Sequence, residues 1–416
     1  MTSDHSQLTI RDARRFVETE VFGNGHDPHG LGVELEWHCK LRDSQQRIPI
    51  ERAHALIEQL TPLAGGGRLT IEPGGQLEIS SALFHTIDEV CDATTADLFE
   101  LTRVCADHEF TLCAVGTDAT RPPHRVATHP RYVAMESYFE QFGPAGRIAM
   151  CNTAALQINI GLGDPTQAHN RWRLANWLGP TLIALFANSP LADGAPSHWK
   201  STRLRSWWAA DASRTAPVNL ELPPIEAWTD YALNALVMVI RTTDGRFIPM
   251  AEPLRFGEWI NNGHQLGWPT IDDFAYHLTT LFPPVRPKGW LELRMLDALP
   301  WPTWLVAFAV STILLTDPLV TSEVVEALDG SVGLWNEAAE VGLANAHLRR
   351  SAQAIFDIAV PALASAEVDP NLQQLVADYQ VQSVVIGQCP ADLQLEAWHR
   401  GDELLSPMPA EPIDCR

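Results

Sequence analysis

Polar side chains alternate with branched aliphatic side chains in four short segments of this sequence, and this alternation constrains the fold more than any other feature. In a β-strand, side chains two positions apart project from the same face and lie about 6.6 Å apart. The four polar pairs are Glu34 with Glu36, Gln76 with Glu78, Gln157 with Asn159, and Glu292 with Arg294. Leu or Ile stands between the members of each pair. The pattern therefore predicts an antiparallel sheet with one apolar and one polar face.

The remaining sequence predicts helices around this sheet and one large α+β unit over residues 1–416. Strands are expected at 31–38, 71–80, 154–160 and 290–296, and helices at 9–22, 85–110, 166–188, 227–241 and 304–315. Residues 116–132 and the Arg- and Trp-rich stretch 197–217 are expected to be structured loops, and the last fifteen residues to be loosely ordered. Residues 304–400 are expected to be mainly helical.

Composition and charge exclude several classes of protein. Hydrophobic residues make up 46% of the chain, which is ample for a large core. The net charge of -22 disfavours a nucleic-acid partner. Seven scattered cysteines form no CxxC pair, and neither a signal-type apolar segment nor a membrane-length apolar run occurs. These features predict a cytoplasmic protein with reduced thiols and without a membrane partner.

The polar strand pairs also suggest a metal site. Carboxylates on one face of a sheet repel one another unless cations compensate them, and Mg²⁺ or Mn²⁺ takes oxygen ligands of this kind. The Pro73-Gly74-Gly75 turn would bring Glu72 to the same site as Glu78. Lys288, Arg214 and Arg294 are candidates to neutralise phosphate charge. The alternative is that each pair forms only the solvated face of an amphipathic strand, and the residues alone leave both interpretations open.

Other catalytic motifs are absent or incomplete. Gly65-Gly66-Gly67 is not followed by the Lys-Ser/Thr of a P-loop, so a flexible turn is the simpler interpretation. The sequence has no HExxH metal motif and no GxSxG nucleophile elbow. Trp207 and Trp208 fit packing better than a platform for a nucleobase.

Several long motifs together resemble the plant-type and actinobacterial glutamate-cysteine ligases, including the branch that opens ergothioneine biosynthesis. The matching motifs are GVELEW at 32–37, IEPGGQLEIS at 71–80, QIN at 157–159, LFANSPLADGAPSHWKSTRLRSWW at 185–208, DASRT at 211–215, and HLTTLFPPVRPKGWLELRMLDALP at 277–300. The resemblance covers residues 32–304. It implies a glutamine-synthetase-like catalytic fold, in which helices surround a saddle-shaped antiparallel sheet and ATP enters one end of a funnel.

The resemblance also implies roles for individual residues. Glu34, Glu36, Glu78 and Glu292 match Mg²⁺ ligands, and Glu72 and Gln157 are additional candidates. Asn159, Arg214 and Arg294 resemble groups around the ATP phosphates. Arg203 matches an arginine placed for a substrate carboxylate, although the neighbouring Arg205 leaves that alignment ambiguous.

The implied reaction joins the γ-carboxylate of L-glutamate to the amine of L-cysteine through γ-glutamyl phosphate, with Mg-ATP consumed. The product would serve ergothioneine or glutathione biosynthesis, and the protein would be a monomer or a homodimer. Two alternatives stay open. One is a sister carboxylate-amine ligase that uses a different amine, and the other is a catalytically idle sensor that keeps the sheet.

Overall fold

The computed structural model describes residues 7–23, 26–403 and 405. Its main sheet has seven strands in the order β10-β11-β5-β1-β3-β2, with β4 paired to β1, and all the pairings are antiparallel. The strands are β1 (Leu31–Leu41), β2 (Arg68–Ile71), β3 (Leu77–Ser80), β4 (Phe110–Cys113), β5 (Ala155–Gly161), β10 (Val285–Pro287) and β11 (Trp290–Asp297). Two small hairpins are formed by β6 (Leu191–Ala192) with β7 (Ala195–Pro196), and by β8 (Val239–Arg241) with β9 (Phe247–Pro249).

Helices surround the sheet. In the first part of the chain they are α1 (Ile10–Phe16), α2 (Ile50–Gln59), α3 (Ile87–Asp107), α4 (Pro130–Phe139), α5 (Ala145–Cys151), α6 (Pro165–Phe186), α7 (Thr202–Ala210), α8 (Ala212–Thr215) and α9 (Pro224–Asn234). The later helices are α10 (Phe256–Asn262), α11 (Ile271–Leu278), α12 (Thr303–Thr316), α13 (Thr321–Ala327), α14 (Trp335–Val341), α15 (Ala346–Ser365), α16 (Pro370–Tyr379) and α17 (Pro390–Arg400). A π-helical turn, Val17–Val21, continues α1.

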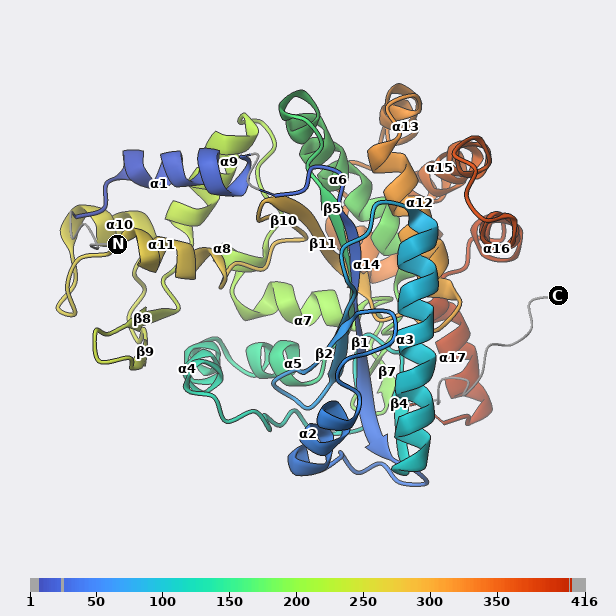
Figure 1. The fold of residues 1–416 in the computed structure, drawn as a ribbon, viewed down its shortest axis with the longest axis horizontal. Helices are drawn as coiled ribbons and strands as arrows, with labels where there is room; N and C mark the ends of the chain where they lie inside the picture. The colour runs from blue at the N-terminus through green and yellow to red at the C-terminus, as the bar shows by residue number, and fades with distance from the viewer. Residues whose placement is uncertain (1–6, 24–25, 404, 406–416) are drawn as a thin grey trace.

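The two faces of the sheet differ as the alternation predicts. Val33, Leu35 and Trp37 are buried on β1, whereas Glu34 and Glu36 between them are only partly buried. On the apolar side, α6 contacts β11, α12 contacts β5 and α3 contacts β1. Figure 1 shows the sheet close to its edge, with α3, α12 and α15 on one side and α4, α5 and α7 on the other. The polar face is therefore turned toward α4, α5 and α7.

The predicted α+β class and antiparallel sheet are confirmed, and three element predictions are wrong. The strand predicted at 71–80 is instead the end of β2, a turn at 72–76 and β3. The stretch 197–217 contains α7 and α8. Ser201 and Asp211 cap these helices, and the buried Arg203 side chain of α7 forms hydrogen bonds with β11. The helix predicted at 227–241 ends at Asn234, and residues 239–241 form β8 instead. Most of the predicted loosely ordered C-terminus lies outside the described residues.

One core connects most of the chain. The largest cluster of buried apolar residues runs from Leu8 to Val384, and on this basis we retain the single-domain organisation as a proposal. Within the described residues, no single helix is long and apolar enough to cross a membrane. Among the helices that the structure describes, α12 and α13 reach that length and hydropathy only as a pair, and they are bent by 115°.

Candidate active site

Strand register brings the predicted polar pairs together on one face of the sheet. The directly opposed residues are Glu34 with Gln157, Glu36 with Glu78, and Asn159 with Glu292. Opposed side chains in neighbouring strands lie close enough to interact. The four sequence segments therefore contribute to one continuous polar surface across β3, β1, β5 and β11.

The turn between β2 and β3 adds Glu72. The backbone N–H of Gly75 donates to the carbonyl of Glu72 at 2.9 Å, and Gly75 has a φ of 89°, which glycine adopts without strain. A Cβ on Gly74 would lie 2.0 Å from the carbonyl oxygen of Cys151, so a larger residue cannot occupy that position without displacing the backbone. The two glycines thus let the turn pack against the end of α5 and place Glu72 at the cavity.

A cavity of about 250 Å³ lies over this polar surface, and we call it the central cavity. Six of the predicted site residues line it: Glu34, Glu36, Glu72, Glu78, Gln157 and Arg294. Its other side is formed by α4, α5 and α7 through Arg131, Tyr132, Met135, Ala149, Met150 and Trp207, together with Phe282 and Arg286. The cavity is therefore closed by residues from distant parts of the sequence.

Four carboxylates on this surface, Glu34, Glu36, Glu72 and Glu78, form what we call the acidic wall. Burial, together with the charge of Glu78, raises the pKa of Glu36 to about 8. Burial and the charges of Glu292 and Glu78 raise the pKa of Glu34 to about 6, and burial with Glu78 raises the pKa of Glu72 well above its usual range. The charged forms of these groups are therefore under-compensated by the protein itself.

The carboxylates of the acidic wall are held mainly by neutral donors. Glu36 accepts hydrogen bonds from the backbone N–H of Ala155 and from Nε2 of Gln157, both at 2.9 Å. Nδ2 of Asn159 donates to Glu34 at 3.1 Å. In these rotamers, no three acidic, His or Cys side chains of the described residues converge into a preformed metal site. The carboxylate oxygens are the hard ligands that a divalent cation requires, so the acidic wall fits such an ion, although these rotamers do not form a complete coordination shell.

Glu292 has the opposite environment, and we call it and its cationic partners the paired rim. Its carboxylate contacts Arg286 at 2.7 Å, Arg294 at 2.8 Å and Lys288 at 3.0 Å. Burial alone would raise the pKa of Glu292, but these three positive charges outweigh burial and hold the pKa well below its usual range. Lys288 lies at the edge of the site, with its ammonium 4.6 Å from the ring centre of Trp290.

A second pocket of about 40 Å³ adjoins the central cavity and shares Glu36, Trp207 and Arg294 with it; we call it the small pocket. Arg203 lines this pocket, whereas Arg205 is exposed and lies 5.9 Å from the ring centre of Trp199. Of the two arginines, Arg203 therefore lines the small pocket, and Arg205 lines neither the small pocket nor the central cavity.

Arg214 does not reach either cavity, in contrast to its predicted position at the ATP phosphates. Its side chain is fully buried and pairs with Asp211 at 2.7 Å. It also donates to the hydroxyl of Tyr138 and to the carbonyls of Thr280 and Leu236. Arg214 therefore joins α8 to α4 and to the segment 280–282, whose Phe282 lines the central cavity. Asn159 lies on the predicted face, but it lines a neighbouring cavity with Trp290, whose Nε1 donates to Oδ1 of Asn159 at 2.8 Å.

Arg286, Arg131 and the cavity position of Trp207 were not predicted from the sequence. Arg286 could have been found, because the short hairpin of β10 and β11 places it directly opposite Glu292. Arg131 comes from the start of α4, and the sequence gives no signal that this helix closes over the sheet. Trp207 donates from Nε1 to Oγ1 of Thr153 at 3.3 Å and so has a polar contact at the cavity as well as a packing role.

Comparisons with known proteins bear on the family of this chain. The family model described as glutamate-cysteine ligase family 2 matches residues 30–402. The glutamate-cysteine ligase EgtA of Mycolicibacterium smegmatis is 37% identical over 358 residues, which is 84% of each chain. EgtA of Mycobacterium tuberculosis (strain CDC 1551 / Oshkosh) is 36% identical over 87% of this chain and 84% of the relative. The chloroplastic glutamate-cysteine ligase of Brassica juncea is 28% identical over 57% of this chain and 47% of the relative.

A solved structure supports the fold independently. The glutamate-cysteine ligase of Francisella tularensis, solved in complex with AMP, matches with a TM-score of 0.54 at 11% identity and covers 90% of this chain and 86% of that one. Because the identity is so low, this likeness bears on the fold alone. The family match spans most of the chain and includes all four polar strand pairs. The chain therefore belongs to glutamate-cysteine ligase family 2.

Proposed function

We propose that this protein is an ATP-dependent glutamate-cysteine ligase, which joins the γ-carboxylate of L-glutamate to the amine of L-cysteine. The observation that carries the proposal is the single polar sheet face, where an under-compensated acidic wall lies beside a paired rim of arginine and lysine. Metal-bound nucleotide phosphates need both kinds of group, carboxylates for the cation and cationic side chains for the phosphate oxygens. The names of the relatives supply the substrates.

We assign the metal ligands to the acidic wall, with Glu292 and Gln157 as further candidates. Bound Mg²⁺ would neutralise phosphate charge and relieve the repulsion that raises the pKa values of Glu34 and Glu36. The amide of Gln157 lies between Glu36 and Arg294, which places it beside the proposed metal site. Its Nε2 donates to Glu36, and its Oε1 accepts from Arg294. Mn²⁺ has similar oxygen preferences and is expected to substitute.

We assign phosphate recognition to Arg294, with Lys288, Arg286 and Asn159 in supporting positions. Arg294 lines both the central cavity and the small pocket, so its guanidinium lies between the acidic wall and the pocket lined by Arg203. Arg203 is assigned to a substrate carboxylate. Arg214 is assigned a structural role, because its side chain is fully buried and its guanidinium is already engaged by Asp211, Tyr138 and the carbonyls of Thr280 and Leu236.

The reaction balances without a covalent enzyme intermediate. A γ-carboxylate oxygen of glutamate attacks the γ-phosphorus of ATP, which forms γ-glutamyl phosphate and releases ADP. The amine of cysteine then attacks the acyl carbon, loses a proton, and displaces inorganic phosphate to give γ-glutamylcysteine. Phosphoryl transfer of this kind depends mainly on positioning and charge neutralisation. We place the product in ergothioneine biosynthesis, with glutathione biosynthesis as the alternative, and the enzyme in the cytoplasm.

An amine panel tests the proposal. Purified protein is incubated with Mg-ATP, glutamate, and cysteine, glycine, alanine or a polyamine, and phosphate release is recorded with the product mass. We expect release that requires both glutamate and cysteine, with γ-glutamylcysteine as the product. Release with another amine instead would move the protein to a sister ligase, and silence with every pair would favour a sensor.

A further inference from the structure

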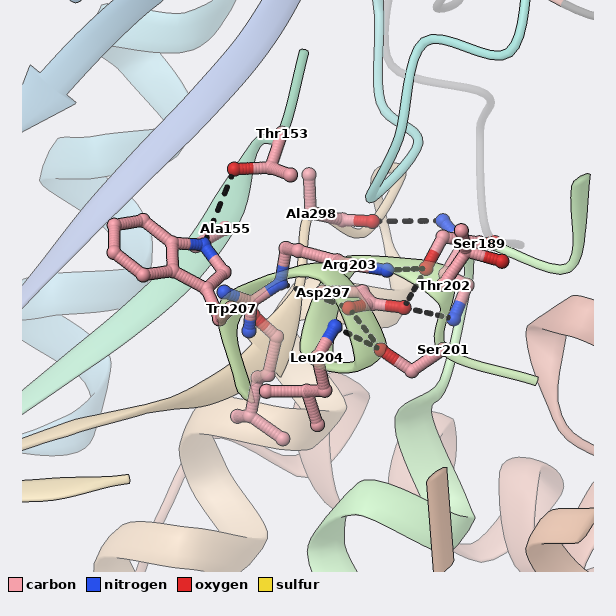
Figure 2. Close-up of polar contacts among 12 residues, drawn as sticks. Thr153, Ala155, Ser189, Ser201, Thr202, Arg203, Leu204, Trp207, Asp297 and Ala298 are labelled. Carbon is pink, nitrogen blue, oxygen red and sulfur yellow. Dashed lines mark hydrogen bonds and ion pairs between the residues drawn. The ribbon is translucent and has the colours of Figure 1, made fainter. Parts of the chain in front are cut away.

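Asp297, at the end of β11, connects three segments beside the small pocket. Its Oδ1 accepts hydrogen bonds from Oγ of Ser201 and Nε of Arg203, both at 2.8 Å. Its Oδ2 accepts from the backbone N–H of Asn188 and from Oγ of Ser189, both at 2.7 Å. Figure 2 shows this carboxylate between the loop after α6 and the start of α7. The side chain of Asp297 is completely buried, so its charge is compensated entirely by these contacts.

The guanidinium of Arg203 is fixed on two of its three nitrogens. Nε donates to Asp297, and Nη2 donates to the carbonyls of Arg294 at 2.9 Å and Leu296 at 2.7 Å. These carbonyls lie at the irregularity where the pairing of β11 with β5 shifts between Leu293 and Leu296. A bulge of this kind frees backbone groups from the strand ladder and makes them available to a side chain.

Only Nη1 of Arg203 has no acceptor among the residues that the structure describes, and the guanidinium is planar and rigid. Fixing Nε and Nη2 therefore also fixes the direction of the two Nη1 hydrogens. Arg203 lines the small pocket, which has room for roughly three water-sized groups and so for a carboxylate, but not for a nucleotide. The charge of Arg203 also lowers the pKa of Glu36 against the larger effect of burial, which places the guanidinium near that carboxylate.

We propose that Asp297 is a positioning residue that orients Arg203, so that Nη1 binds the α-carboxylate of glutamate. The inference rests on the proposed ligase function. The γ-carboxylate must meet the γ-phosphate at the acidic wall, so the other end of glutamate extends into the adjoining small pocket. Glutamate is phosphorylated before cysteine attacks, and its site must therefore exist without cysteine. Asp297 itself contacts only protein groups, so it acts through Arg203.

Asp297→Asn is the direct test. Asparagine keeps the volume but must turn an N–H toward either Nε of Arg203 or the backbone N–H of Asn188, and neither of these donors can accept it. We expect the KM for glutamate to rise about 10- to 100-fold, as when a hydrogen bond to a charged group is lost. The KM for ATP should stay within about twofold, and kcat should change less than the KM for glutamate.

A competitor separates positioning from general loosening of the cavity. 4-Aminobutyrate carries the amine and the γ-carboxylate of glutamate but lacks the α-carboxylate. If Asp297 acts through Arg203, the Asp297→Asn variant loses much of the wild-type preference for glutamate over 4-aminobutyrate, because only glutamate used the oriented Nη1. Equal weakening of both compounds, or an increase in the KM for cysteine instead, would overturn the proposal.

Asp118→Asn is the matched control. Asp118 is also buried, accepts from the Nε of an arginine, Arg121, and accepts three further bonds from Thr120 and the backbone of Arg121. Neither member of this pair lines the central cavity or the small pocket. Its loss should lower stability but leave the KM for glutamate within about twofold. An equal rise in KM in both variants would assign Asp297 a purely structural role.

A second variant keeps the test decisive if Asp297→Asn does not fold. Ser189→Ala changes no residue of α7, but it removes one donor to Oδ2 and the acceptor of the backbone N–H of Arg203. The KM for glutamate should then rise by a smaller factor, roughly two- to fivefold. An unchanged KM in a folded Ser189→Ala variant would contradict the positioning role. If the wild-type protein releases no phosphate with glutamate and cysteine, the proposed function itself fails, whereas normal wild-type turnover with unaltered variants rejects only the role of Asp297.

Discussion

Glu36, which is partly buried, and Glu292, which is fully buried, lie on the same sheet face, but their surroundings are opposite. Glu36 is held by an amide and a backbone N–H beside another carboxylate, and the pKa of its carboxyl rises to about 8. Glu292 contacts three cationic side chains, and its pKa falls well below the usual range. Burial raises the pKa of both carboxyls, so the neighbouring charges decide whether the pKa ends above or below its usual value. Under the proposed function, the acidic wall would receive a cation brought with the substrates, whereas the arginines and lysine of the paired rim would contact phosphate while they neutralise Glu292.

The largest expected effect is the loss of turnover in Glu36→Gln. Removing this carboxylate from the acidic wall should lower kcat about 10²- to 10³-fold, because charge neutralisation on the transferred phosphate weakens. The fold should persist, since Glu36 without metal is mainly protonated at pH 7 and glutamine resembles that neutral form. Phosphate release and a thermal melt measure the two properties. Near-normal turnover would remove Glu36 from the metal site.

Glu292→Gln should affect stability where Glu36→Gln does not. It leaves Arg286 and Arg294 partly buried without their carboxylate, and breaking a buried ion pair typically costs about 3–5 kcal/mol. Urea unfolding of metal-free protein measures the loss, with Glu326→Gln on the exposed surface of α13 as the control. Equal unfolding free energies for Glu292→Gln and wild type would contradict the distinction between the paired rim and the acidic wall.

Magnesium should stabilise the wild-type protein through the acidic wall. At ten times its dissociation constant, a ligand that binds only the folded state adds about 1.4 kcal/mol to the unfolding free energy. Melting curves with MgCl₂, compared with NaCl at equal ionic strength, measure this shift. The Glu36→Gln variant should respond less, while Glu326→Gln should respond as wild type does. An undiminished response in Glu36→Gln would place the cation elsewhere.

The smallest effect is expected for Arg205→Ala. Arg205 is exposed and contacts Trp199 at a distance typical of a cation–π pair, which contributes about 0.5–1 kcal/mol at an exposed site. The kcat/KM of Arg205→Ala should therefore stay within about twofold of wild type. Arg203→Lys, by contrast, should raise the KM for glutamate, because lysine cannot reproduce the fixed guanidinium. A larger effect at Arg205 than at Arg203 would reverse the assignment.

The period-two alternation predicted the polar sheet face, because the face on which a strand side chain lies follows from its position in that strand alone. Glu34, Gln157 and Glu292 share that face in the observed register. The burial of Arg214 could not be predicted in the same way, because its partners Tyr138, Leu236 and Thr280 are distant in sequence. The helix α7 was missed for a related reason: its buried Arg203 looks unsuited to a core until β11 supplies Asp297 and two free carbonyls.

Isotope transfer from glutamate to phosphate tests the central claim most directly. Glutamate labelled with ¹⁸O in its γ-carboxylate is converted with Mg-ATP and cysteine, and the released phosphate is analysed by mass. Formation of γ-glutamyl phosphate predicts one ¹⁸O atom in each phosphate released together with γ-glutamylcysteine. Unlabelled phosphate would contradict the ligase mechanism proposed for this polar sheet face. So would labelled phosphate that is released equally fast without cysteine.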